Sequence, residues 1–188
     1  MPANPVQLIE PRRHGDARGW FTETYNRETF VARGIDSVFV QDNHSLSRPA
    51  FTLRGLHFQS PPRAQDKLVR CIRGRIRDVA VDVRAGSPTY GRSVTAELSE
   101  DNGYQLFVPI GFAHGFLTLE PDCEVVYKCS DTYAPEVDGG IAWDSAGIDW
   151  PLPSGIGPEL SAKDQNLPRL ADFASPFVYD GNPLQPLA

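Results

Sequence analysis

The sequence predicts an all-β domain, built as an antiparallel sandwich or barrel with one brief helix. Short segments that alternate apolar and polar side chains recur along the chain, and a period of two is typical of strands. The 17 prolines and 16 glycines are scattered rather than clustered, as expected for many turns between short strands. With 188 residues, the chain is long enough for one domain with a sizeable core. We therefore expect a single domain over residues 1–188 that is mostly irregular from Asp131 onward.

The first part of the chain predicts three strands and the helix. Asn26 is a residue type that caps helix N-termini and Gly34 is typical of a helix end, so a short helix is expected between them. Residues 11–19 form a polar loop, and its end at Asp16 to Gly19 has the chemistry of a turn. The expected strands cover residues 6–9, 20–25 and 38–45.

Three polar residues of the strand at 38–45 lie on one side, because side chains of a strand alternate between its faces. These residues are Gln41, Asn43 and Ser45. That side is either a hydrogen-bonding wall inside the protein or a solvated face. Taken alone, polar side chains favour the solvated face.

The middle of the chain predicts further strands at residues 53–59, 66–72, 76–83, 93–98, 104–109 and 123–130. The strands at 66–72 and 76–83 are expected to pair as a hairpin about Arg73-Gly74-Arg75. In the second of these strands Val79, Val81 and Val83 line one face. Residues 109–116 are expected to form a tight, glycine-bounded corner that exposes His114.

The strand at 53–59 carries polar residues that a purely structural strand has little reason to contain. Strict alternation would place Arg54 and His57 on opposite faces. A bulge at Gly55 would bring both side chains to one face, and bulges are often found beside active sites. The alternative is a half-buried strand in which His57 is simply hydrogen-bonded within the core.

Charge and cysteine content exclude several classes of function. The net charge of −6 provides neither a basic footprint for nucleic acid nor a polybasic patch for anionic lipid. Residues 1–10 lack the basic start and apolar run of a signal peptide, and no segment has the apolar length of a membrane span. Cys71, Cys123 and Cys129 lack metal-ligand spacing and are interpreted as reduced thiols. We therefore expect a cytoplasmic protein without nucleic-acid or membrane partners.

Two kinds of site are consistent with the histidines in apolar surroundings, His57 and His114. Histidines from two strands plus a carboxylate could hold iron, zinc or manganese, but the sequence has neither a His-x-His pair nor a glutamate close after His57. The other interpretation is acid–base chemistry without a metal. In it His57 is the base, Asp164 orients it, Lys67 stabilises an oxyanion and Tyr127 donates a proton.

A set of motifs in register resembles one known family, the dTDP-4-dehydrorhamnose 3,5-epimerases, which are cupin jelly-roll enzymes of the dTDP-rhamnose pathway. The resemblance covers residues 5 to 175. Its motifs, in chain order, are Asp16-x-Arg18-Gly19, Gln41-Asp42-Asn43, Leu53-Arg54-Gly55-Leu56-His57, Lys67-Leu68-Val69-Arg70, Pro109-x-Gly111-Phe112-Ala113-His114-Gly115-Phe116, Tyr127-Lys128, Tyr133-x-Pro135, Gly147-Ile148-Asp149-Trp150-Pro151 and Ser161-x-Lys163-Asp164.

The resemblance implies a role for each matching residue. His57 is implied to remove the proton beside the sugar ketone with Asp164 as its partner, Lys67 to stabilise the enolate oxygen, and Tyr127 to return a proton from the opposite face. Tyr133 is implied to stack on the thymine ring. The other substrate-contacting positions are Arg18, Glu23, Gln41, Asp42, Asn43, Arg54, His114, Asp138 and Lys163. At position 138 the family commonly has glutamate, so Asp138 keeps the charge with a shorter reach.

The resemblance further implies a dTDP-sugar substrate, a homodimer, and catalysis without a cofactor or metal. Three alternatives stay open from the sequence. The first is an epimerase that inverts only C3 or C5 in another dTDP-deoxysugar pathway. The second is a metal-dependent cupin, and the third is a binding module for sugar nucleotides without catalytic activity.

Overall fold

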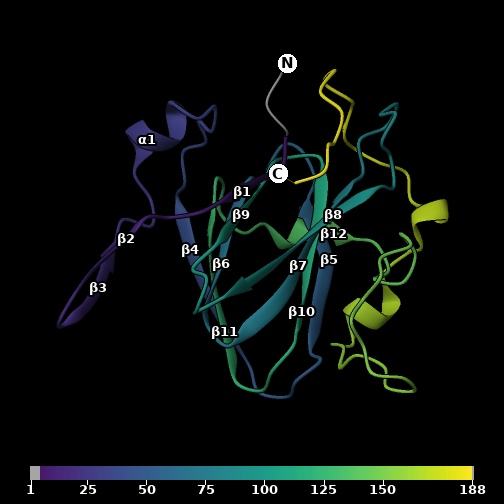
Figure 1. The fold of residues 1–188 in the computed structure, drawn as a ribbon. Helices are drawn as coiled ribbons and strands as arrows, with labels where there is room; N and C mark the ends of the chain where they lie inside the picture. The colour runs from purple at the N-terminus through teal and green to yellow at the C-terminus, as the bar shows by residue number, and fades with distance from the viewer. Residues whose placement is uncertain (1–4, 188) are drawn as a thin grey trace.

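Two antiparallel sheets face each other in the computed structural model, which describes residues 5–187 (Figure 1). The predicted all-β architecture is confirmed. In the first sheet the strand order is β1 (Gln7–Ile9), β9 (Gln105–Val108), β6 (Lys67–Arg73), β11 (Cys123–Cys129) and β4 (Gln41–Ser47). In the second sheet it is β12 (Asp138–Gly140), β5 (Leu53–Gln59), β10 (Phe112–Thr118), β7 (Arg75–Asp82) and β8 (Ser93–Ser99).

The described helices are short. Helix α1 (Arg27–Val31) confirms the predicted helix, because the Asn26 side chain accepts hydrogen bonds from the backbone N–H groups of Glu28 and Thr29. Three single-turn 3₁₀ helices follow later in the chain, namely η1 (Pro135–Val137), η2 (Asp164–Asn166) and η3 (Leu170–Asp172). None of the described helices is long and apolar enough to span a membrane.

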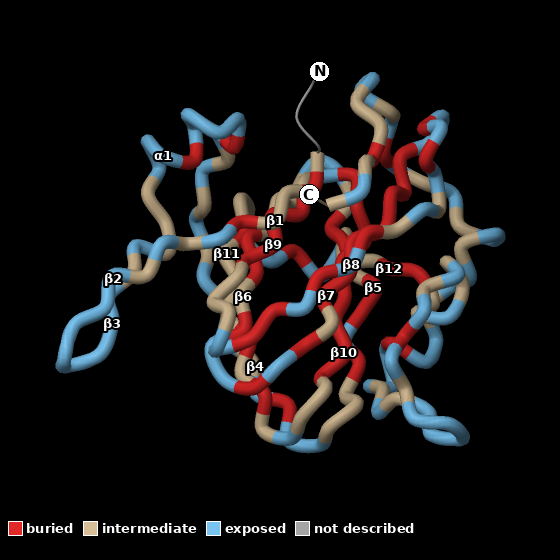
Figure 2. Tube along the Cα trace, in the orientation of Figure 1, coloured by how far each residue is buried: buried red, intermediate tan, exposed pale blue. Residues whose placement is uncertain are grey.

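Strand β7 shows how the core is arranged, because both of its faces are buried (Figure 2). Ile76 and Ala80 belong to the apolar core between the two sheets. The predicted valine face, Val79 to Val83, packs with residues of the irregular C-terminal segment in a second apolar cluster, outside the core between the sheets. That segment therefore provides a third layer over the second sheet.

The predicted hairpin about Gly74 is wrong. Strand β6 pairs with β9 and β11, whereas β7 pairs with β8 and β10 in the other sheet. Gly74 lies where the chain crosses between the sheets, with φ +74° and no room for a Cβ beside Cys123. A glycine turn between two strands looks the same in sequence whether the strands pair as a hairpin or the chain crosses to the other sheet. The sequence pattern therefore could not separate the two.

The predicted corner at residues 109–116 is also wrong for most of its length. Its turn is confined to the residues around Gly111, which has φ +91°. From Phe112 the chain forms β10, whose seven residues are all buried. His114 is therefore buried in a central strand rather than exposed at a corner, and the apolar neighbours around it are core residues.

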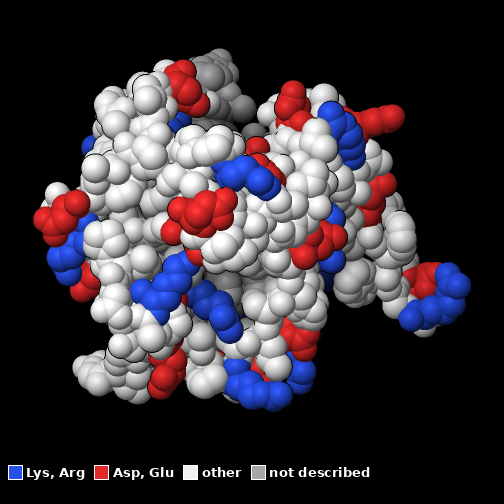
Figure 3. Space-filling view, turned by 180° about the vertical axis from the view of Figure 1, so that it is seen from behind, with Lys and Arg blue, Asp and Glu red and all other residues white. Residues whose placement is uncertain are grey.

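Two short strands lie where the sequence predicted irregular chain. Strand β12 extends the second sheet beside β5. Strand β2 (Arg13–Asp16) lies in the expected polar loop and pairs with β3 (Gly19–Thr22), forming a hairpin that projects from the body of the protein (Figure 1). Its residues are exposed along most of the hairpin (Figure 2), and acidic and basic groups lie together at its tip (Figure 3).

Candidate active site

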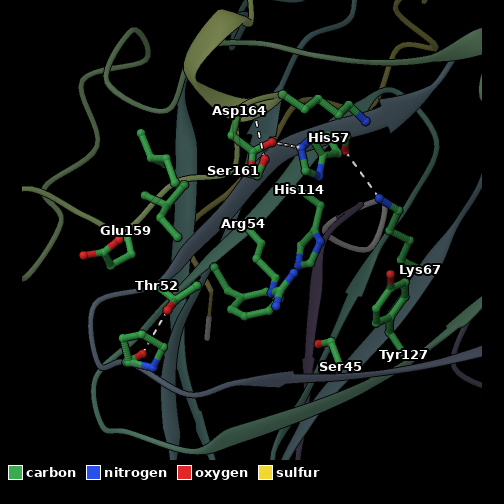
Figure 4. A pocket seen from close by; sticks show the side chains of 15 residues that line it. Ser45, Thr52, Arg54, His57, Lys67, His114, Tyr127, Glu159, Ser161 and Asp164 are labelled. Carbon is green, nitrogen blue, oxygen red and sulfur yellow. Dashed lines mark hydrogen bonds and ion pairs between the residues drawn. The ribbon is translucent and has the colours of Figure 1, made fainter.

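A cavity of about 480 Å³ opens between the two sheets, at the end where β4, β6 and β11 face β5 and β10 (Figure 4). Residues 159–164 of the irregular C-terminal segment close one side. Seven residues of the predicted site line this cavity together, namely Arg54, His57, Lys67, His114, Tyr127, Lys163 and Asp164. The fold thus gathers in one space residues that are more than 100 positions apart in the sequence.

Arg54 and His57 reach the same cavity because β5 is bulged at Gly55, as predicted. Arg54 lies opposite Phe116 and His57 opposite His114, so two residues of β5 face one residue of β10. Gly55 has φ +144°, and a Cβ at this position would lie 2.6 Å from the Cα of Gly115. The bulge therefore requires glycine.

His57 is held by a buried carboxylate. Its Nε2–H donates to Oδ1 of Asp164 at 2.5 Å, which leaves the lone pair of the neutral ring on Nδ1. Burial by itself raises the pKa of Asp164, but the hydrogen bond and charge of His57, with smaller contributions from Ser161 and Lys163, bring that pKa below its ordinary value. The pair can therefore take up a proton on His57 while Asp164 stays ionised.

His114 belongs to a second histidine–aspartate pair, at the back of the cavity. Its Nε2–H donates to Oδ1 of Asp78 at 2.7 Å. Asp78 is fully buried on β7, and its Oδ2 has no hydrogen-bond partner in the described chain. Asp78 could not be recognised as a site residue from the sequence, because nothing in its strand distinguishes it from Asp82, which pairs with Arg84.

Lys67 and Tyr127 come from neighbouring strands of the first sheet, and the Lys67 ammonium donates to the backbone carbonyl oxygen of His57 at 3.4 Å (Figure 4). Loss of hydration lowers the pKa of Lys67, although Cys129, Asp138 and Asp78 act against this change. Loss of hydration raises the pKa of Tyr127. The tyrosine therefore holds its proton more tightly, and the lysine less tightly, than an exposed residue of the same type.

A second cavity of about 280 Å³ continues from the first past His57 and Lys67. Polar side chains dominate its lining, among them Gln41, Asn43, Gln59, Tyr133, Asp138 and Lys163. Gln41 accepts a hydrogen bond from the backbone N–H of Tyr133 at 2.9 Å and donates to Asn43 at 3.1 Å. The interpretation of this side of β4 as a solvated face is thus wrong, because it is a hydrogen-bonding wall inside the protein.

Comparison with known proteins connects this arrangement to one family. Residues 2–172 match the model of the family described as dTDP-4-dehydrorhamnose 3,5-epimerase. The chain belongs to the dTDP-4-dehydrorhamnose 3,5-epimerase family. One relative, the dTDP-4-dehydrorhamnose 3,5-epimerase of Sinorhizobium fredii, is 51% identical over 176 residues, which cover 93% of this chain and 89% of that protein. The members of this family are isomerases, as the resemblance predicted.

Solved structures of related epimerases have the same fold, and the predicted cupin jelly roll is confirmed. The dTDP-6-deoxy-D-glucose-3,5-epimerase of Legionella pneumophila, crystallised with dTDP-4-keto-L-rhamnose, has a TM-score of 0.88 at 40% identity and covers 94% of this chain and 95% of its own. A 3'-monoepimerase of Streptomyces bikiniensis, in complex with dTDP-quinovose, has a TM-score of 0.82 at 34% identity, covering 90% of this chain and 86% of its own.

Three of the residues that the resemblance implies as substrate contacts do not line either cavity. Arg18 lies at the tip of the projecting hairpin, where it pairs with Asp16 at 2.5 Å. Glu23 follows the hairpin and accepts a hydrogen bond from the Asn26 side chain. Asp42 lies on the outer face of β4, where it accepts a hydrogen bond from Lys128 at 2.9 Å.

The epimerase site also contains residues that the sequence analysis did not single out for a role in it. Ser45 and Phe116 line the larger cavity, and Cys129 lines the smaller one. Ser45 could be recognised from the sequence, since alternation places it on the same face as Gln41 and Asn43. Phe116 and Cys129 are apolar residues of predicted strands and match ordinary core positions, so no sequence pattern distinguishes them from core residues.

The described residues contain no group of three or more histidine, cysteine, aspartate or glutamate side chains placed to hold a metal ion. The three cysteines are free and buried.

Proposed function

We propose that this chain inverts C3 and C5 of dTDP-4-dehydro-6-deoxy-D-glucose by acid–base chemistry, giving dTDP-4-dehydro-L-rhamnose. One observation carries the proposal. His57 on the second sheet, paired with Asp164, and a tyrosine on the first sheet face the same cavity, with a lysine beside the tyrosine. An epimerase needs this arrangement, because a proton leaves one face of the carbon and another arrives on the opposite face.

The proposed reaction moves protons and no electrons. Nδ1 of His57 takes the proton from the carbon beside the ketone, and the C–H electron pair becomes part of an enolate. The Lys67 ammonium stabilises the negative charge on the enolate oxygen. Tyr127 then gives its phenolic proton to the opposite face of the same carbon, and solvent restores the protonation states of both groups. The same cycle at the second carbon completes the double inversion.

The smaller cavity is proposed to hold the nucleotide end of the substrate. Tyr133 has a largely exposed ring that can stack on a base, and Gln41 and Asn43 provide amide groups for hydrogen bonds. Arg54 lies in the larger cavity, where its guanidinium donates to Ser47 and to the carbonyl of Leu46 and remains able to bind phosphate oxygens. Binding energy from this arm positions the sugar at His57.

Double inversion is favoured over inversion of one carbon, because the relative named as a 3,5-epimerase is 51% identical whereas the named monoepimerase is 34% identical. The test is incubation with the keto-sugar nucleotide in deuterated water, followed by NMR of the product. We expect deuterium at both C3 and C5 and inverted configuration at both carbons. Deuterium and inversion at one carbon only would assign the chain to the alternative class.

We also propose a homodimer in which the projecting hairpin brings Arg18 to the partner's cavity. The hairpin carries exposed Trp20 and Phe21 away from the body of its own chain, and exposed aromatic residues are typical of interfaces. Arg18 lies at its tip and lines neither the larger nor the smaller cavity that contains His57 in its own chain. A guanidinium supplied by the partner would complete the phosphate-binding groups of the site.

Subunit mixing tests this arrangement. Arg18→Ala and His57→Ala should each lower activity, and heterodimers formed by co-expression should regain it, since one of their two sites then has both residues intact. If Arg18 acted within its own chain, every site of the heterodimer would lack one residue and activity would not return.

The proposed reaction requires no cofactor, metal, nucleic acid or membrane, and we propose that it takes place in the cytoplasm. Turnover should survive exhaustive dialysis against a chelator. Loss of turnover that returns with one added metal would contradict the metal-free mechanism.

A further inference from the structure

One carboxylate oxygen of Asp138 contacts two other side chains at the edge of the smaller cavity. Oδ2 of Asp138 accepts a hydrogen bond from the Tyr133 hydroxyl at 3.0 Å and also pairs with the Lys163 ammonium. The Asp138 side chain is 13% exposed, whereas that of Lys163 is 47% exposed. A largely buried carboxylate therefore holds two side chains that are each about half exposed.

Asp138 is itself fixed to the strand that carries His57. It opens β12, in which Asp138 pairs with Gln59 and Gly140 pairs with His57. A Cβ on Gly140 would lie 2.4 Å from the carbonyl oxygen of Leu56, so the two strands are in close contact. The position of the Asp138 carboxylate is thus set by the same strand that positions the base.

The turn that carries Asp164 has few other attachments. Residues 161–166 include η2, and their other hydrogen bonds in the described chain stay between residues 160 and 166. Only two hydrogen bonds connect them to the rest of the described chain, one from His57 to Asp164 and one from Lys163 to Asp138. Removing the second leaves the His57–Asp164 bond as the single polar attachment of this turn.

We propose that Asp138 is a positioning residue that acts on catalysis through the Lys163–Asp164 turn, rather than a contact for the nucleotide. Its carboxylate anchors Lys163, and Lys163 keeps Asp164 in line with His57. Because the same oxygen holds Tyr133, the residue that faces the nucleotide is fixed to the pair that handles the proton. This inference rests on the proposed function, in which the His57–Asp164 pair is the base of the epimerase.

Asp138→Asn tests the inference, because the amide keeps the shape and loses the charge that holds Lys163. We expect kcat to fall about 10- to 100-fold, the scale of a small misplacement of catalytic groups. The Kd of dTDP, measured by calorimetry, should stay within about twofold, because in this inference Asp138 makes no contact with the nucleotide. Weakened dTDP binding with kcat retained would overturn the inference and make Asp138 a nucleotide contact.

A matched control is Asp144→Asn, which breaks the exposed ion pair of Asp144 with Arg169 in the same irregular segment and should leave kcat unchanged. Lys163→Met provides a second route if Asp138→Asn does not fold. It should lower kcat by a similar factor, and an unchanged kcat would overturn the inference. Where both variants fold, the double variant should lose no more activity than either single variant.

The wild-type protein separates this inference from the proposed function. If wild-type enzyme does not exchange deuterium into the keto-sugar nucleotide, the proposed function fails before the variants are compared. If it does exchange, the division between kcat and dTDP affinity in Asp138→Asn decides the role of Asp138 alone.

Discussion

His57 and Tyr127 face one cavity from opposite sheets, His57 on β5 and Tyr127 on β11 (Figure 4). Each position follows from its own strand, and only the packing of the two sheets brings them together. The two groups differ in chemistry as well as position. His57 has a carboxylate partner that holds its ring, whereas burial raises the pKa of Tyr127, so that the phenol retains its proton. This difference supports a base on one side of the sugar and an acid on the other.

The first prediction concerns the two members of the base pair. His57→Ala removes the proton acceptor, so turnover and deuterium exchange at C3 and C5 should fall about 10²–10⁴-fold. Asp164→Asn keeps the shape but loses the charge that stabilises the imidazolium, so its loss should be severe but smaller. Initial rates of exchange by NMR measure both losses. Near wild-type exchange in His57→Ala would mean that another group is the base.

The second prediction concerns pH. Because its pKa is lowered, Lys67 should lose its proton, and with it the charge that stabilises the enolate, as pH rises through a value below the ordinary 10.5. The raised pKa of Tyr127 keeps that phenol protonated beyond its ordinary value of 10.0. NMR titration of protein with ¹⁵N-labelled lysine, assigned with Lys67→Met, measures the lysine directly. A Lys67 titration at or above 10.5 would contradict the effect of burial inferred here.

The third prediction concerns the bulge in β5. Gly55→Ala places a Cβ against the backbone of Gly115 and requires alanine at φ +144°. We expect a loss of stability of about 1–3 kcal/mol for the backbone strain alone, measured by urea unfolding. Gly157→Ala is the matched control, because its Cβ meets nothing within 4 Å and its φ is not in the left-handed region. Equal stability of the two variants would show that the bulge does not depend on glycine.

Strand positions could be predicted from the sequence, but the sheet to which each strand belongs could not. Alternation located β5, β6, β7, β8 and β11 to within a few residues, because the period of two is a local property. Sheet membership depends on long-range pairing, and the turn at Gly74 looks the same whether the chain returns or crosses. Strand β12 was missed because three residues, Asp138 to Gly140, are too few to show a period.

The site could be predicted where several motifs agree. It could be predicted less well where the direction of a side chain determines whether the residue lines the cavity. Arg54 and His57 were placed together because the glycine between them suggested a bulge. Asp42 was grouped with Gln41 and Asn43 because they are adjacent in the sequence, yet alternation turns Asp42 outward. The place of Arg18 depends on where a projecting hairpin ends, which no local pattern shows.

The central claim is that His57 removes protons and Tyr127 returns them from the opposite face, and Tyr127→Phe in deuterated water tests it most directly. Phenylalanine preserves the packing of the ring and removes only the proton donor. We predict that deuterium still enters the starting material at C3 and C5, because His57 continues to form the enolate, while formation of inverted product falls steeply. An unaltered rate of inversion, or equal and modest losses of exchange and inversion, would contradict this account.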